Sequence, residues 1–66
     1  MPQIIDAIKH GNMIIIDDVD KRFNKKLVDS IEELLLDKNI NKKNTQLIAS
    51  VNNKDYVGEN RKIVWI

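Results

Sequence analysis

The stretch that decides the fold is Ile14-Ile15-Ile16-Asp17-Asp18-Val19-Asp20, where a short apolar run ends in a cluster of carboxylates. With Met13 included, the run predicts a strand over Met13–Asp17, because it is too short for a helix and rich in β-branched residues. The apolar residues do not alternate with polar ones, which is typical of a parallel strand buried on both faces. We therefore expect helices to cover both faces of this strand.

A short helix is expected before the strand, over Pro2–His10. Proline suits the first position of a helix, and Gly11 suits the position after its end. The helix carries isoleucines at helical spacing, namely Ile4, Ile5 and Ile8. His10 falls in the last turn, where a cation interacts favourably with the helix dipole. A solvated histidine is favoured over a metal ligand or a base, because the chain has no cysteine and no second histidine.

A longer helix is expected after the strand, from Lys25 to about Asp37, with Asn24 as its N-cap. Its apolar stripe consists of Leu27, Val28, Ile31, Leu34 and Leu35. The intervening Val19–Asn24 is interpreted as a loop. Lys25 and Lys26 oppose the helix dipole in the first turn, which favours a surface pair facing the loop acids over a ligand site.

The rest of the chain alternates polar connections with apolar strands. The predicted connections are Lys38–Asn44 and Asn52–Arg61, and the predicted strands are Thr45–Val51 and Lys62–Ile66. Gly58 is the expected turn in the second connection. Trp65 in the last strand is interpreted as filling the core, with stacking on a nucleobase as the alternative.

This order of elements predicts one small α/β domain over residues 1–66. We expect a three-stranded, mainly parallel sheet with right-handed crossovers and two helices. A hydrophobic fraction of 42% is sufficient for a packed core, although 66 residues make that core thin. The chain has no cysteine, so disulfides and thiolate metal sites are excluded.

Charge and hydropathy narrow the classes of partner. The 11 basic and 10 acidic residues leave a net charge of +1, so nucleic-acid binding is not expected. No apolar run approaches the roughly 20 residues that a membrane helix needs. The first residues lack a basic region followed by an apolar one, so we expect no secretory signal and a cytoplasmic location.

The ends of the first two strands carry the chemistry that the sequence offers. Asp17 and Asp18 end the first strand, and Asn52 and Asn53 follow the second. In an open α/β sheet, ligands bind beyond the carboxyl ends of the strands. One or two carboxylates with waters and phosphate oxygens suit Mg²⁺, and a second carboxylate can orient an attacking water. The alternative is that these acids only form turns.

The order and spacing of these segments resemble the C-terminal half of the nucleotide-binding domain in ABC-like and SMC-like P-loop ATPases. The branch they resemble most is the AAA-type ATPases of bacterial defence and abortive-infection systems. The resemblance covers Gly11–Ile66. Ile14–Asp20 is similar to the Walker B strand, which in the family has four apolar residues followed by Asp-Glu. The segments similar to the D-loop, the switch strand and the final strand are Asp20–Lys25, Thr45–Asn53 and Arg61–Ile66.

The resemblance implies a magnesium ligand at Asp17. It places Asp18 at the catalytic glutamate position and Asn52 at the switch histidine position, so both are departures from the family pattern. Asp18 is one methylene shorter than glutamate, and Asn52 can donate to a γ-phosphate but carries no positive charge. The sequence contains no G-x-x-x-x-G-K-[ST] loop to cradle phosphates. We therefore expect no ATP hydrolysis by the chain alone, and binding of Mg²⁺ with ATP only in a site that a partner completes.

The missing P-loop strand also has a structural consequence. In the family it lies between the switch strand and the final strand. Without it, Thr45–Val51 and Lys62–Ile66 either pair directly or leave a slot for another chain. An unpaired apolar strand edge favours association, so we expect self-association or a protein partner at that edge.

Three functions follow from these interpretations. The first is a non-catalytic fragment or short relative of such a nucleotide-binding domain, which completes or competes for the sheet of a larger ATPase. The second is a small protein-interaction or regulatory module with a decayed nucleotide site. The third is an enzyme that uses Asp17 and Asp18 with Mg²⁺ on a phosphate substrate. A phosphoacceptor receiver domain is excluded, because its later strand would end in a further aspartate where this chain has Ser50-Val51-Asn52.

Overall fold

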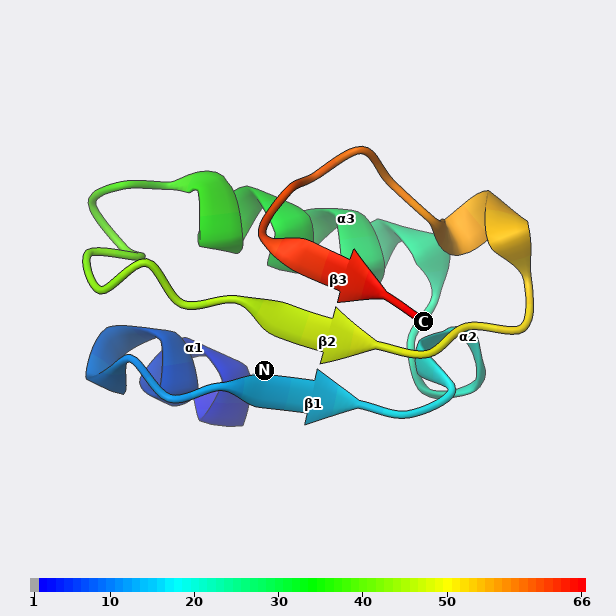
Figure 1. Cartoon of the computed structure of the whole chain (residues 1–66), viewed down its shortest axis with the longest axis horizontal. Helices are drawn as coiled ribbons and strands as arrows, with labels where there is room; N and C mark the ends of the chain where they lie inside the picture. The colour runs from blue at the N-terminus through cyan, green and yellow to red at the C-terminus, as the bar shows by residue number, and fades with distance from the viewer. Residues whose placement is uncertain (1) are drawn as a thin grey trace.

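Three parallel strands form one sheet in the computed structural model, which describes residues 2–66 (Figure 1). The helices in chain order are α1 (Pro2–His10), α2 (Val19–Arg22), α3 (Lys25–Leu36) and the 3₁₀ helix η1 (Lys54–Tyr56). The strands are β1 (Ile14–Ile16), β2 (Leu47–Ala49) and β3 (Ile63–Trp65). The predicted α/β class with a small parallel sheet is confirmed.

The sheet has the order β1-β2-β3, and both strand pairs are parallel. In register, Ile15 lies beside Ile48, and Ile48 lies beside Val64. The backbone N–H of Leu47 donates to the carbonyl of Lys62 at 2.8 Å, so β2 and β3 pair directly. Of the two arrangements that the sequence leaves open, direct pairing is therefore the one adopted. β1 and β3 form the two outer edges of this sheet (Figure 1).

The core lies on one face of the sheet. The buried side chains that the strands contribute are Ile14, Ile16, Leu47, Ala49 and Ile63. They cluster with buried residues of the helices, namely Ile8, Val19, Val28, Ile31 and Leu35. Both α1 and α3 therefore pack against the same face, and Figure 1 shows α3 behind the strands.

The opposite face of the sheet carries apolar side chains that the described helices do not cover. Ile15 is 71% exposed and Val64 is 46% exposed, although their neighbours in the strands are buried. The expectation that β1 is buried on both faces is therefore wrong. The reason is that α1 and α3 share one side, while the connection from β2 to β3 contains only the short η1.

The ends of the two longer helices follow the predicted signals. Gly11 has a φ of 74°, and the backbone N–H of Asn12 donates to the carbonyl of Ala7 at 2.9 Å to close α1. At the start of α3, the side chain of Asn24 accepts a hydrogen bond from the backbone N–H of Leu27 at 2.8 Å. These contacts confirm the predicted helix end and N-cap.

Two connections differ from their predicted form. Val19–Arg22 is a short helix instead of a loop, because Val19 is buried and its carbonyl accepts the backbone N–H of Phe23 at 2.9 Å. Gly58 is not the turn of the last connection, since the turn lies at Arg61 and Lys62. A Cβ atom at Gly58 would collide with the carboxylate of Glu32, so glycine allows the backbone at this position to lie close to that side chain.

A buried amide holds the connection between α3 and β2. The side-chain nitrogen of Asn41 donates to the carbonyls of Leu35 at 2.8 Å and Thr45 at 2.9 Å. Its side-chain oxygen accepts the backbone N–H of Thr45 at 2.7 Å. The polar run that includes Asn41 is therefore partly an internal structural link and not only a solvated loop.

Among residues 2–66, none of the helices combines the length and the apolar character needed to cross a membrane.

Candidate functional site

Ser50 joins the carboxyl ends of β1 and β2. Its hydroxyl accepts a hydrogen bond from the backbone N–H of Asp18 at 2.7 Å and donates to the carboxylate of Asp17. The backbone N–H of Ser50 also donates to the carbonyl of Ile16 at 3.0 Å, which continues the strand pairing. The two strand ends therefore meet, as the parallel arrangement predicts.

Asp18 adopts the left-handed conformation, with φ 51° and ψ 54°. Aspartate tolerates this conformation better than most residues with a side chain. Its carboxylate makes no cap hydrogen bond to α2, although Asp18 is the N-cap residue. The carboxylate instead accepts a hydrogen bond from the side-chain nitrogen of Asn52 at 3.0 Å. The two positions that the resemblance assigns to catalysis are thus bonded to each other.

Asp20 binds the backbone that follows β2. Its carboxylate accepts the backbone N–H of Asn53 at 2.7 Å and that of Asn52 at 3.2 Å. Desolvation acts to raise the pKa of Asp20, but these backbone hydrogen bonds together hold that pKa below its ordinary value. The Asn53 side chain lies outside this contact, because it accepts the backbone N–H of Asp55 at 3.0 Å at the start of η1.

The sequence predicts functional roles for Asp17, Asp18 and Asn52, but it predicts none for Ser50 and places Asp20 only in the D-loop segment. The structure brings the first three together and adds the other two as the residues that link the strand ends. The sequence offers one signal for Asp20. It lies three residues after Asp17, the predicted end of the first strand, and two amide residues, Asn52 and Asn53, follow the second strand.

At this edge, hydrogen bonds from side chains link the end of β1 to the segment after β2, and the carboxylate of Asp17 is exposed. Among the described residues, Asp17 accepts a hydrogen bond from Ser50, and the carboxylates of Asp18 and Asp20 bind the segment after β2. Within residues 2–66, no three histidine, aspartate or glutamate side chains are grouped so that they would hold a metal ion.

The other candidate side chains have structural contacts. His10 is exposed at the end of α1, and its Nδ1 lies 2.7 Å from the carbonyl oxygen of Asp6, as expected for a solvated helix end. Trp65 is half-buried and packs against the core, as expected. Lys25 pairs with Asp29 of the same helix at 2.8 Å, so the expectation that it faces the loop acids is wrong. This hydrogen bond raises the pKa of Lys25.

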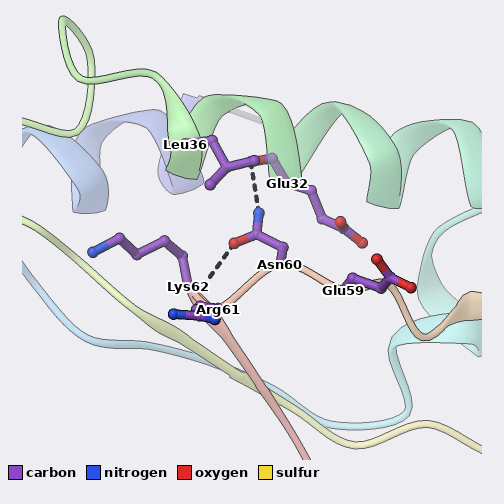
Figure 2. Close-up of a pocket in the computed structure, with 6 residues that line it drawn as sticks. All are labelled: Glu32, Leu36, Glu59, Asn60, Arg61 and Lys62. Atoms are coloured by element: carbon purple, nitrogen blue, oxygen red, sulfur yellow. Dashed lines mark hydrogen bonds between the residues drawn. The ribbon is translucent and has the colours of Figure 1, made fainter.

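A surface pocket of about 590 Å³ lies at the opposite end of the sheet, between α3 and the segment that leads into β3. Its lining residues are Glu32, Leu36, Glu59, Asn60, Arg61 and Lys62 (Figure 2). Asn60 ties the two sides together, donating to the carbonyl of Glu32 at 3.0 Å and accepting from the backbone N–H of Lys62 at 2.7 Å. The Oε1 atom of Glu32 is buried without a partner among the described residues, and burial raises the pKa of this carboxyl.

No protein-family model, curated protein or solved structure matches this chain. The relation to P-loop ATPases therefore stays a prediction from the residues of the strand ends.

Proposed function

We propose that this chain is a non-catalytic protein-interaction module, built on a Walker B-like strand, and that a protein partner covers the exposed face of its sheet. The observation that carries the proposal is the exposed apolar face of the sheet, with Ile15 71% exposed and Val64 46% exposed. Parallel sheets ordinarily have both faces covered. A contiguous apolar surface on a small protein is typical of a site that binds another protein.

The carboxyl edge supports a non-catalytic role. The Asp18 carboxylate binds Asn52, and the Asp20 carboxylate binds the backbone after β2. A water-activating carboxylate must be free to approach the water, whereas these two hold loops together. We infer that the chain does not hydrolyse ATP by itself.

A partner can approach an outer strand edge or the exposed apolar face of the sheet, called the open face below, which carries Ile15, Ile48 and Val64. Each edge strand is three residues long, so it offers few backbone groups for pairing with another strand. The open face offers side chains from all three strands. The geometry therefore favours the face over the edge as the main binding surface.

A photo-crosslinking amino acid at position 15, introduced in cells that naturally make the protein, tests the interaction function. The matched control is position 36, because Leu36 is 57% exposed but lies on α3, away from the open face. We expect a covalent protein adduct from position 15 and none from position 36. Absence of any adduct at position 15 would contradict an interaction module of this kind.

A second candidate is a contribution to a Mg²⁺–ATP site that a partner completes, in line with the resemblance. The exposed position of Asp17 at the carboxyl edge favours it. NMR titration with Mg²⁺ and ATP tests it, observing the amides of Asp17, Asp18 and Asn52. We expect no saturable shift in the isolated chain. A saturable shift that Asp17→Asn removes would establish a nucleotide site within the chain.

We also infer that the chain works in the cytoplasm. The lack of cysteine supports this location, since small secreted domains are commonly stabilised by disulfides.

A further inference from the structure

We infer that a second copy of this chain docks on the open face, so that the two sheets pack against each other in a symmetric dimer. The open face is defined here by its apolar residues, Met13, Ile15, Ile48, Val64 and Ile66. This inference rests on the proposed function, because it names the partner for the surface that carries that proposal.

The residues of the open face form one continuous surface. Ile15, Ile48 and Val64 lie in one row across the three strands. Strand alternation places Met13 on the same side as Ile15, and Ile66 on the same side as Val64. Met13 is 69% exposed and Ile66 is 77% exposed, so the surface extends beyond both ends of the strands.

The size of the face is suited to a stable dimer. Figure 1 views the molecule down its shortest axis and shows the sheet face-on, and the two longer extents are 30 and 21 Å. A typical specific interface buries about 800 Å² on each partner. This requirement is about one sixth of the accessible surface of 4686 Å², and the exposed side chains of Met13, Ile15, Val64 and Ile66 contribute its apolar part.

The shape of the face favours another sheet over a helix as its occupant. The central row consists of β-branched side chains from strands in register, and the pocket beside α3 is lined by other residues. Sheets pack face to face at about 10 Å through such side chains, with the strand axes of the two sheets aligned, parallel or antiparallel, to within about 30°. A second copy provides a sheet of the same width and composition.

The charges near the face decide how the two copies are related. In a two-fold interface each residue meets the same surface of its partner, so charges near the centre would repel each other. The central residues here are uncharged, and Asp17 lies at the carboxyl end of the same face, bonded to Ser50. Antiparallel strands in the two copies place the Asp17 carboxylates at opposite ends of the interface. We therefore expect the β1 strands of the two copies to run in opposite directions.

Sedimentation equilibrium of the whole chain, from about 10 µM to about 1 mM, tests this inference over the range of weak to moderate affinity. We expect a monomer–dimer equilibrium. Ile15→Lys should weaken dimerisation by at least about tenfold, because it places an uncompensated charge at the centre of the interface. Leu36→Lys is the matched control on α3 and should leave the dimerisation constant unchanged.

Ile15 lies outside the buried core, so its substitution is expected to leave the fold intact, which circular dichroism verifies. If Ile15→Lys nevertheless fails to fold, Ile15→Thr keeps the strand propensity and should weaken dimerisation in the same direction. Intermolecular methyl NOEs from Ile15 and Val64, in a sample of mixed isotope labelling, provide an independent measurement of the same contact.

A wild-type chain that remains monomeric at the highest concentration would overturn the second copy as the occupant. So would a Leu36→Lys variant that dissociates as readily as Ile15→Lys. A monomer whose position 15 crosslinks to a different protein in cells would overturn this inference and leave the proposed interaction function standing.

Discussion

The Ser50 hydroxyl accepts the backbone N–H of Asp18 at 2.7 Å, across 32 positions of sequence. This contact holds Asp18 in its left-handed conformation at the point where the chain leaves β1. The same hydroxyl donates to Asp17, so one side chain orients two consecutive acids. The carboxylate of Asp17 and the backbone of Asp18 are therefore both held by a residue that follows β2.

Removal of this hydroxyl should destabilise the fold. We expect Ser50→Ala to lower the free energy of unfolding by about 1–3 kcal/mol, because the Asp18 N–H loses its partner at a partly buried position. Urea denaturation measures the change. Ser30→Ala is the control, since Ser30 is exposed on α3 and alanine favours a helix. If both variants lose the same free energy of unfolding, the hydrogen bonds of Ser50 contribute no more to stability than those of an exposed helical serine.

The Asp20 carboxylate should make stability depend on acid pH. Because the pKa of Asp20 is lower in the folded chain, the stabilisation is present above its unfolded pKa and is lost as the pH falls through its folded pKa. Asp20→Asn should therefore be less stable than the wild type at neutral pH, with a difference that shrinks below about pH 4. Urea denaturation over a pH series measures this difference. A constant difference at all pH values would contradict the role of the charge.

The Glu32 carboxyl should have the opposite dependence. Burial raises its pKa, so its favourable contribution is present below the unfolded pKa and is lost as the pH rises through the folded pKa. Glu32→Gln should therefore be more stable than the wild type at neutral pH and about equal to it in acid. Thermal unfolding at several pH values measures this gain. Glu33→Gln, an exposed neighbour on α3, is the control for the loss of one carboxylate.

Restoring the glutamate of the P-loop ATPase pattern should not create an enzyme. We expect Asp18→Glu to show no hydrolysis of ATP with Mg²⁺, because the chain has no phosphate-binding loop. It should also lower stability by about 1 kcal/mol, since glutamate is less suited to the left-handed conformation. Asp18→Asn, which suits that conformation, should retain most of the stability. Measurable ATPase activity in Asp18→Glu would contradict this prediction and show that the chain can bind ATP productively without that loop.

Local signals in the sequence were sufficient for the two longer helices and the three strands, whereas the short helices α2 and η1 were not predicted. The end of α1 at Gly11 and the start of α3 at Asn24 depend on residues within a few positions, so their chemistry is visible in the sequence. The apolar runs likewise predicted all three strands. Each of these features is determined by short-range backbone geometry.

The features that were not predicted depend on where distant segments meet. Ile14 and Ile15 are the same residue type, yet one is buried and the other exposed, because both longer helices pack on one side of the sheet. The composition of a strand shows that it can be buried but not whether the chain supplies a cover. The contacts of Ser50 also require β1 and β2 to be aligned, which no local pattern specifies.

The central position of β2 also has a kinetic consequence. Pairing with β3 closes a shorter stretch of chain than pairing with β1, so it costs less entropy and should form earlier during folding. Pulse-labelling hydrogen exchange should then protect the amide of Leu47, which donates to Lys62, before the amide of Ser50, which donates to Ile16. In this order, β1 and its acidic end join last, so the carboxyl edge is assembled only when the rest of the sheet already exists.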